Sequence, residues 1–389
     1  MNKVYFKGLA EIRALAALFV IFHHLELYKH RDGISSLYDT PFNYFISHLG
    51  KNGVYIFFVL SGFLITYLLL TEKKSKEKID IKKFYFRRIL RIWPLYYLIV
   101  LISFTIIPFL ALNFEMFQEE THYYTRILLL NESPYLTLLL FLLFLPNLAL
   151  SIRPAVVGAS QSWSVGVEEQ FYLIWPHLIN RIKKKHILVT LFLIICFIPQ
   201  IVKSTIYISP KLEVYLSYII KLIPIHFMSI GALGAFFLFF FKDNVRKIFL
   251  NKYLFFLNTI LTLFLLSSDL KLPLRELVFG FIIIFEILFI IQPNFKFNLR
   301  NKYLEKIGDI SYGVYMYHPL MMYICFSFWN TICPVENIVL YNICIYGSII
   351  ASTFILSKLS FLYYEKRFIT LKNKKFTIIH SGKTPSNKT

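Results

Sequence analysis

Apolar blocks alternate with short polar connections along the whole chain. Eleven mostly apolar blocks occur, at about 9–27, 53–71, 92–112, 135–150, 168–180, 187–202, 222–241, 248–267, 274–291, 310–332 and 338–361. The longer blocks approach the roughly 20 residues that a helix needs to cross a bilayer. The pattern predicts an all-α, polytopic membrane helix bundle with about ten transmembrane helices. We expect residues 1–365 to form the transmembrane domain and 366–389 to form a basic, partly disordered cytoplasmic tail.

The polar connections indicate the side of the membrane, because loops rich in Lys and Arg stay in the cytoplasm. Residues 72–91 carry six Lys and three Arg, whereas 113–134 carry four Glu and one Arg. Further basic connections lie at 181–186, 242–247, 296–306 and 365–375. Following these sides along the chain gives ten net crossings, with both termini in the cytoplasm.

Residues 135–180 interrupt the regular alternation. They hold two apolar blocks that are each short for a full span, joined by the polar linker "SIRPAVVGASQSWSVGVEEQ". The side assignments allow only one net crossing here, so we predict a broken or re-entrant segment. Non-helical backbone at membrane depth is tolerated only when it is buried in protein or lines a wet cavity. The linker is therefore a candidate functional region.

Composition supports the membrane class and excludes others. Hydrophobic residues make up 57% of the chain, and the mean hydropathy is +0.59. The net charge is +20, but the basic residues flank apolar blocks and form no single patch, so we expect no nucleic-acid partner. The four cysteines lack metal-ligand spacing, so we expect no metal. Arg13 interrupts the first block, which is unlike a cleaved signal peptide.

Charged and titratable residues inside an apolar block are costly and need a physical reason. Arg13 and His24 are eleven residues apart, about three helical turns, so they share a face with His24 roughly 16 Å further along. His23 points about 100° away from that face. Two structural roles stay open as alternatives: Arg13 extending to the lipid headgroups, and His24 bonding a neighbouring helix.

A pair of carboxylates, Glu168 and Glu169, leads into the apolar part of "QSWSVGVEEQFYLIWP". Adjacent side chains on a helix point about 100° apart, so only one of the two is expected to face a given site. The alternative is an ordinary helix N-terminus, with Ser162 or Ser164 as the capping residue.

Two further clusters stand out. Arg87, Arg88 and Arg91 precede Trp93 in "FYFRRILRIWPLYY", which suits a topology anchor with interfacial aromatics. Planar guanidiniums also bind phosphates well. His318 lies within "DISYGVYMYHPL", where a structural role is the simpler interpretation.

These segments, in this order, resemble the acyltransferase family 3 membrane proteins, a large bacterial family of integral membrane O-acyltransferases. The resembling stretches run from residue 8 to about 320 and include "GLAEIRALAALFVIFHH", "NGVYIFFVLSGFLIT", "FYFRRILRIWPLYY", "SWSVGVEEQFYLIWP" and "ISYGVYMYHPL". The resemblance implies acyl transfer, often of acetyl, from cytoplasmic acyl-CoA to a hydroxyl of a cell-surface glycan or lipid-linked sugar. It also implies a multi-pass protein of the bacterial cytoplasmic membrane, surrounded by membrane lipids.

The resemblance gives the candidate residues their roles. His24 is expected to act as general base or transient acyl carrier, and Arg13 to orient the donor or stabilise negative charge. Glu168 or Glu169 is expected to orient an imidazole or bind sugar hydroxyls. The candidates for docking the CoA phosphates are Arg13, Arg87, Arg88 and Arg91. Acyl-CoA enters as a substrate, and no permanently bound cofactor is expected.

Three further points complete the expectation. His318 and Trp163 are candidates for contact with substrate, and Ser61 is more readily explained as a small residue for helix packing than as a nucleophile. A transporter or flippase of a glycolipid is the alternative, since buried Arg, His and Glu also line transport paths. The identity of the acceptor and the oligomeric state stay open.

Overall fold

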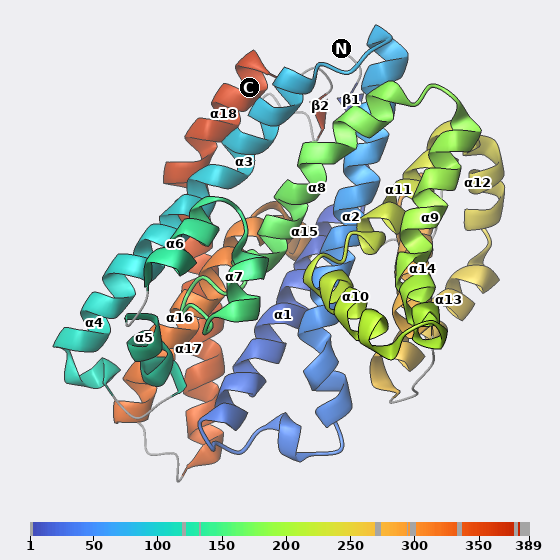
Figure 1. Cartoon of the computed structure of the whole chain (residues 1–389). Helices are drawn as coiled ribbons and strands as arrows, with labels where there is room; N and C mark the ends of the chain where they lie inside the picture. The colour runs from blue at the N-terminus through green and yellow to red at the C-terminus, as the bar shows by residue number, and fades with distance from the viewer. Residues whose placement is uncertain are drawn as a thin grey trace.

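The structure is a computed structural model that describes residues 3–118, 122–131, 134–268, 274–293, 295, 301–332, 337–376 and 380–381. Within these residues the chain is almost wholly helical, with one parallel pair of two-residue strands, β1 (Lys3–Val4) and β2 (His380–Ser381). The all-α class predicted from the apolar blocks is therefore confirmed for this part of the chain (Figure 1). Cys333 and three acidic residues of the predicted outer connection, Glu119, Glu120 and Glu132, lie outside the described residues.

The helices that position the site are α1 (Leu9–Arg31), α2 (Asn43–Lys76), α3 (Ile81–Leu101), α8 (Ser162–Arg181), α15 (Lys302–Asp309) and α16 (Ser311–Ile332). The other longer helices are α9 (Lys185–Ser204), α10 (Pro210–Leu222), α11 (His226–Phe240), α13 (Lys252–Ser267), α14 (Arg275–Ile290) and α17 (Ile338–Ser360). The remaining α-helices are α4 (Ile107–Asn113), α5 (His122–Asn131), α6 (Pro134–Leu142), α7 (Pro146–Ile152), α12 (Lys242–Phe249) and α18 (Lys366–Lys375).

Small residues allow α2 to pack closely against α1 and α11. A Cβ atom at Gly53 would come within 2.7 Å of the Ala16 carbonyl oxygen on α1. At Gly231 it would come within 2.0 Å of the Val59 carbonyl oxygen, across the α2–α11 contact. Gly231, in the "GALG" stretch of α11, thus serves close helix packing, because these backbones approach where no side chain fits.

The paired strands β1 and β2, the first and last described elements, lie at one end of the bundle, which we call the termini end (Figure 1). The connections from α2 to α3 and from α8 to α9 lie at the same end, within the basic segments 72–91 and 181–186. The connection from α1 to α2 lies at the other end, which we call the far end. These two segments predicted to be cytoplasmic therefore lie at one end, whereas residues 302–306, in α15, pack near Ala10 at about mid-height. Which side of a membrane they face stays a prediction.

The first helix begins deep in the bundle. Because Ala16 lies opposite Gly53, Arg13 is level with a point roughly 20 Å from the far end of α2 and roughly 30 Å from its other end. His23 lies opposite Gly50, only about 10 Å from the far end of α2. Arg13 is thus near mid-height, and His24 lies in the half of the bundle nearer the far end.

The predicted interruption in 135–180 is present. Helices α6 and α7 are short, 153–161 contain no helix, and α8 begins at Ser162. Gly158, in this connection, has a φ of +80°, a conformation that a side chain would strain. The chain is therefore broken here, as the side assignments required.

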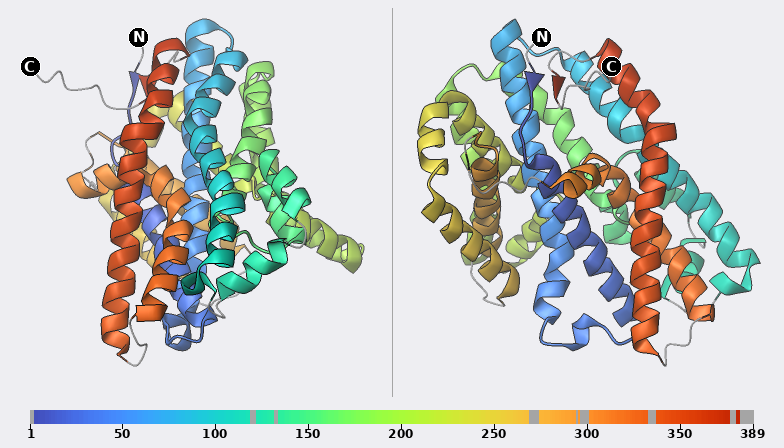
Figure 2. Two further views of the ribbon diagram at one scale, coloured as in Figure 1. Left: turned by 90° about the vertical axis from the view of Figure 1, so that its left-hand side faces the viewer. Right: turned by 180° about the vertical axis from the view of Figure 1, so that it is seen from behind.

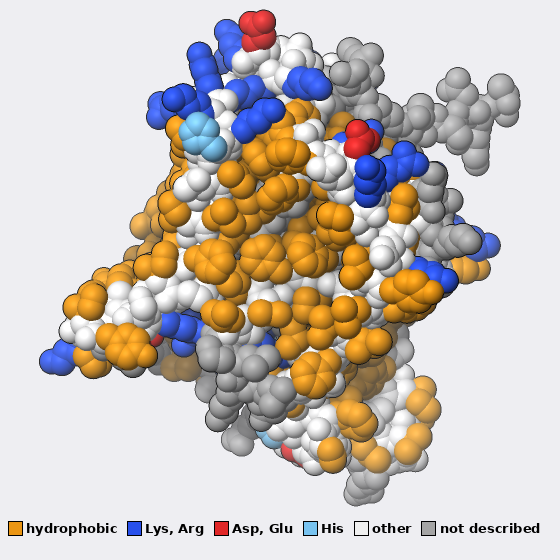
Figure 3. Space-filling view, turned by 90° about the vertical axis from the view of Figure 1, so that its right-hand side faces the viewer, with side chains coloured by type: hydrophobic (Ala, Val, Ile, Leu, Met, Phe, Trp, Pro, Cys, Tyr) orange, Lys and Arg blue, Asp and Glu red, His pale blue; other side chains and the backbone are white. Residues whose placement is uncertain are grey.

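The outer surface is apolar over a broad area. Figure 3 shows hydrophobic side chains covering the middle of one face, with Lys and Arg gathered towards one end. Helix α13 contributes exposed Leu257, Ile260 and Leu263, and α9 contributes exposed Ile194 and Ile201. Surfaces of this kind fit contact with lipid.

In Figure 2, α10 extends away from the main bundle, and α17 and α18 form one long column.

The number of membrane crossings is not settled by helix length and composition. Among the described residues, four helices are long and apolar enough to cross a membrane, or six if each bent helix pair is one span. Helix α14 has 16 residues, and α1 carries Glu11, Arg13, Glu26 and Lys29, which explains why these two do not count. The count of ten transmembrane helices stays a prediction.

Two connections predicted from their charge are partly helical. Residues 242–249 form α12, bent by 75° from α13, and 302–309 form α15, which packs on α1. Gly308 makes this contact possible, because a Cβ there would lie 1.9 Å from the Ala10 carbonyl oxygen. Residues 366–375, within the predicted tail, form α18.

Candidate functional site

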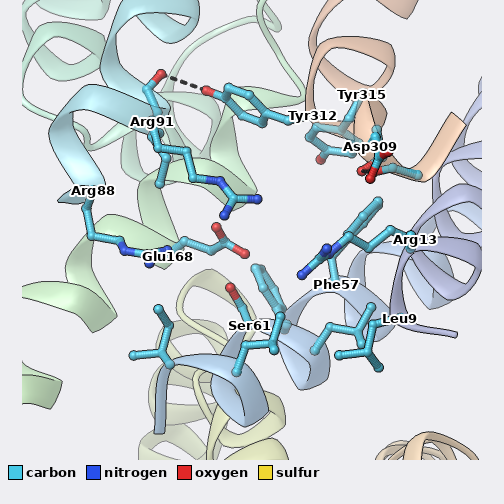
Figure 4. Close-up of a pocket in the computed structure, with 18 of the residues that line it drawn as sticks. Leu9, Arg13, Phe57, Ser61, Arg88, Arg91, Glu168, Asp309, Tyr312 and Tyr315 are labelled. Atoms are coloured by element: carbon cyan, nitrogen blue, oxygen red, sulfur yellow. Dashed lines mark hydrogen bonds between the residues drawn. The ribbon is translucent and has the colours of Figure 1, made fainter. Parts of the chain in front are cut away.

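A cavity of about 420 Å³ lies among α1, α2, α3, α8, α15 and α16, in the half of the bundle nearer the termini end (Figure 4). Its volume falls within the usual range for small-molecule sites. The charged residues that line it are Arg13, Arg88, Arg91, Glu168, Glu305 and Asp309. Formal charges balance inside the cavity, so their placement matters more than their sum.

Helical spacing explains why these side chains meet. Helix α2 lines the cavity with Phe57, Ser61, Leu64 and Leu68, positions three or four apart on one face. On α8 the same spacing brings Ser164, Glu168 and Tyr172 into the cavity. Polar residues three or four positions apart within an apolar helix share one face, so this spacing in the sequence points to a shared polar cavity.

The three arginines near the start of α3 are not equivalent. Arg88 and Arg91 line the cavity, whereas Arg87 donates to Glu72 at 3.0 Å and to the Phe376 carbonyl at 3.1 Å. The Arg88 guanidinium lies 5.5 Å from the ring centroid of Tyr172. Its buried Nε has no hydrogen-bond partner among the described residues. Arg88 thus presents an unsatisfied donor in the cavity wall.

Basic and acidic groups are interspersed around the cavity, and Glu168 lies beside Arg88 and Arg91 (Figure 4). In Figure 4, Arg88 and Arg91 extend from α3 on one side, and Asp309 lies on the opposite side, near Arg13. Arg13 interacts electrostatically with both Asp309 and Glu168. A ligand with separated anionic and neutral parts would be oriented by this arrangement, with its anionic part towards α3.

Ser61, Tyr172 and Glu168 form a hydrogen-bonded chain. Tyr172 donates to Glu168 Oε2 at 3.2 Å, and Ser61 Oγ lies 2.6 Å from the Tyr172 oxygen. Tyrosine has a single hydroxyl proton, so Ser61 donates to Tyr172 when Tyr172 donates to the carboxylate. Ser61 therefore takes part in a polar network at the cavity, beyond the packing role expected from the sequence.

The adjacent carboxylates diverge, as their helical positions require. Glu168 lines the cavity, whereas Glu169 accepts a hydrogen bond from Trp93 Nε1 at 3.2 Å and does not line it. Trp163 also lies outside the cavity lining, with its ring 6.0 Å from that of Phe58.

His24 lies outside this cavity and pairs with His318. His24 Nδ1 lies 2.9 Å from His318 Nε2, and His318 Nδ1 lies 2.7 Å from the Tyr315 carbonyl oxygen. His318 is fully buried, so its ring is neutral. A carbonyl only accepts, so His318 carries its proton on Nδ1 and accepts at Nε2.

The proton positions on His24 follow from this arrangement. Its Nδ1 must donate to His318 Nε2. A neutral imidazole then keeps a lone pair on Nε2. His24 is therefore set up to accept a proton or to act as a nucleophile through Nε2. The neighbouring His23 instead contacts the Ile46 carbonyl at 2.9 Å and the Tyr38 hydroxyl at 3.2 Å.

Some polar residues of the site were not singled out from the sequence. Asp309, Tyr312 and Tyr315 line the cavity and fall within or beside "ISYG", and Tyr172 follows the Glu pair by three residues. The sequence could have pointed to these residues through their helical spacing from residues that had been selected, such as the three positions between Tyr315 and His318. Glu26 is also buried, near the far end, where it pairs with Lys29 at 3.0 Å.

Metal ligands are not gathered in the described part of the chain. No group of three or more His, Cys, Asp or Glu able to hold a metal ion occurs within it. Cys196, Cys325 and Cys344 are free thiols there.

Fold and site together define a class: an apolar, multi-helix membrane protein with an internal polar cavity and a buried histidine pair. Residues 8–358 match the family model described as "Acyltransferase domain", which is nearly the whole chain. The chain therefore belongs to acyltransferase family 3, as the ordered sequence segments indicated. No solved structure matches it significantly.

Relatives of known name include O-acetyltransferases. "O-acetyltransferase OatA" of Staphylococcus aureus is 30% identical over 196 residues, which are 49% of this chain and 28% of OatA. "Putative peptidoglycan O-acetyltransferase YrhL" of Bacillus subtilis is 33% identical over 44% of this chain and 23% of YrhL. "Putative acetyltransferase ORF330" of Acidianus two-tailed virus is 27% identical over 82% and 84% of the two chains. The matches to OatA and YrhL thus span less than a third of those proteins.

Proposed function

We propose that this protein is a membrane O-acyltransferase, with acetyl as the transferred group. Acyl-CoA from the cytoplasm is the donor, and a hydroxyl of a cell-surface glycan or lipid-linked sugar is the acceptor. The bacterial cytoplasmic membrane is the location. The observation that carries the proposal is one helix, α1, that bears Arg13 in an arginine-lined cavity and His24, with a lone pair on Nε2, nearer the far end.

The donor fits the cavity by charge. Arg88 and Arg91 face the cavity from α3, where guanidiniums can grip the phosphates of CoA. With the termini end in the cytoplasm, these arginines lie on the side from which CoA arrives. The thioester arm would then extend towards Arg13, which supplies a fixed positive charge near mid-height. Arg87 is committed to Glu72 and is a weaker candidate for the same task.

The chemistry at His24 is acyl transfer to oxygen. The acceptor hydroxyl gives its proton to His24 Nε2 while its oxygen bonds the acyl carbon. The carbon–sulfur bond breaks, and CoA leaves as a thiolate that takes up a proton. Alternatively, His24 Nε2 first takes the acyl group from CoA and passes it to the hydroxyl. Both routes conserve the acyl group and need no redox partner.

The separation of the two residues constrains the mechanism. Arg13 and His24 are roughly 16 Å apart along α1, so they do not act on one carbonyl at the same moment in this conformation. Arg13 therefore serves donor binding, and the thioester end of acyl-CoA must reach beyond Arg13 to His24. The C–S bond then breaks at His24, while the phosphates of CoA stay at the cavity arginines.

The test compares adjacent histidines in purified, vesicle-reconstituted protein. His24→Ala should insert and fold normally, yet lose transfer of acetyl from acetyl-CoA. His23→Ala removes a neighbouring ring that is hydrogen-bonded to Ile46 and Tyr38 and should retain transfer. Surface-glycan O-acetyl groups, measured by NMR in cells that carry each variant, give the cellular readout. Wild-type O-acetylation with His24→Ala would sink the proposal. Glycolipid movement without acyl-CoA consumption would favour the transporter alternative.

A further inference from the structure

The cavity ends before it reaches His24. On four helices, the lining residue furthest from the termini end is Arg13 on α1, Phe57 on α2, Ser164 on α8 and Tyr315 on α16. We call these four residues the cavity floor. Its two aromatic rings are in edge-to-face contact, with centroids 5.7 Å apart and planes at 67°. In Figure 4, Phe57 and Tyr315 lie on the Arg13 side of the cavity.

The histidine pair lies directly beyond this floor. His318 follows Tyr315 by three residues on α16, with ring centroids 5.8 Å apart. The Tyr315 carbonyl holds His318 Nδ1, and His318 in turn holds His24. The floor is thus a thin partition between a cavity suited to the donor and the residue suited to receive the acyl group.

The two rings of the partition differ in how firmly they are held. The Tyr315 hydroxyl lies 2.8 Å from Ser164 Oγ and donates to the Gln161 carbonyl at 3.0 Å. Tyr315 itself is buried. The Phe57 ring carries no polar group and is only partly buried. Phe57 is therefore the side chain that is free to change rotamer, against a fixed Tyr315.

We infer that Phe57 and Tyr315 form an aromatic gate through which the thioester end of acyl-CoA reaches His24, with the acyl group still bonded to sulfur, and that this gate selects short acyl chains. The inference rests on the proposed function and adds the acyl-chain class to it. An acetyl thioester needs only a small displacement of Phe57, whereas a longer chain beyond the thioester must hold the ring further from its place. Discrimination by one methylene in an apolar site is typically about 10- to 200-fold.

The experiment varies the gate and the acyl chain together. Acetyl-, butyryl- and octanoyl-CoA are supplied to reconstituted protein, and CoA release and transfer are measured. Dissociation constants for the matching thioether analogues, which cannot transfer, are measured in parallel. Phe57→Leu should raise the butyryl-to-acetyl ratio of kcat/KM at least tenfold, and Phe57→Trp should lower acetyl transfer at least tenfold.

Matched controls distinguish the gate from a general loss of packing. Phe63→Leu makes the same change on α2 at a buried ring that does not line the cavity, although it contacts the lining residue Phe6 at the end away from the gate, and it should leave the ratio unchanged. Tyr315→Phe keeps the ring and removes its hydrogen bonds, so it should widen the preference in the same direction as Phe57→Leu. Melting temperatures in detergent confirm that each variant is folded.

The outcomes distinguish the gate from the function on which it rests. A folded, active Phe57→Leu protein with the wild-type chain-length ratio overturns the gate and leaves the transferase proposal standing. Analogue binding that loses chain-length preference in Phe57→Leu supports the gate, even where wild-type protein shows no transfer. That second pattern would contradict the transferase proposal alone.

Discussion

His318 fixes the proton arrangement of His24 and is too deeply buried to be an obvious substrate contact. The Tyr315 carbonyl, His318 and His24 form a chain in which each proton has one acceptor. We therefore assign His318 a positioning role. The sequence placed it among substrate contacts, because the hydrogen bond between residues 294 positions apart is not visible in a linear pattern.

The first prediction concerns this positioning role. His318→Ala should lower kcat by about 100- to 1,000-fold, the range expected when a base loses its alignment, with little change in KM for acyl-CoA. His318→Gln should restore part of kcat, because its amide oxygen can accept from His24 Nδ1. Steady-state kinetics with both variants checks this. A matched rise in KM for acyl-CoA would instead indicate donor contact.

The second prediction separates two neighbouring arginines. Arg88→Ala removes a cavity-facing guanidinium, which should weaken acyl-CoA binding roughly 10- to 100-fold, since hydrogen bonds to charged groups contribute about 1.5–3 kcal/mol. Arg87→Ala breaks the largely buried pair with Glu72 and should chiefly lower stability. Isothermal titration and melting temperature give the two readouts. Equal losses of affinity in both variants would contradict the assignment.

The sequence predicted the directions of side chains correctly where helical geometry alone decides them. Glu168 and Glu169 diverge as adjacent helix positions must, and Arg13 faces a polar cavity. It was incomplete where the decisive contact joins distant segments. Ser61 is an example, because its hydroxyl meets Tyr172 across two helices 111 positions apart. Which of these residues act in catalysis is for the variants to decide.

Close backbone contact between α2 and α11 makes their glycines the most sensitive points at the scale of helices. A Cβ at Gly62 would lie 1.9 Å from the Met228 carbonyl oxygen, which belongs to backbone and cannot rotate away. The helices must therefore separate to admit even one methyl group.

The third prediction follows from that contact. Gly62→Ala should lower the melting temperature of the detergent-solubilised protein by several degrees, because several packing contacts are lost together. Gly347→Ala is the control, because this helical glycine has nothing within 4 Å of the place where a Cβ would stand. Its melting temperature should stay within about one degree of wild type. Similar melting temperatures for both variants would show that α2 and α11 tolerate separation.

The apolar blocks predicted the class and most of the helices, since burial in lipid or protein requires helices wherever the chain is apolar. They did not predict α12 or α15, which are rich in charged residues. These short helices depend on neighbours: α15 forms against α1, where Gly308 meets Ala10. Contacts of this kind arise only in the tertiary structure, so the local pattern of hydrophobic residues cannot predict them.

The gathering of basic segments at the termini end gives the whole molecule a direction. The fourth prediction is that reporters fused to either terminus lie in the cytoplasm, and that a cysteine at the exposed Ser35, between α1 and α2, is labelled from outside. Membrane-impermeant thiol labelling of intact cells, with lysed cells as the control, checks this. Labelling of Ser35→Cys only after lysis would reverse the orientation.

The column made by α17 and α18 has a consequence for where donor binding takes place. The continuous helix from Ile338 to Lys375 has 38 residues and is about 57 Å long, nearly twice the hydrocarbon thickness of roughly 30 Å. If it crosses upright, its last turns stand in water beside α3, whose Arg87 it meets through Phe376. This end of the protein would then project beyond the lipid surface. The nucleotide part of CoA would bind in water at this projecting end, while only the pantetheine arm of CoA reaches into the protein. The phosphates would therefore not have to enter the bilayer.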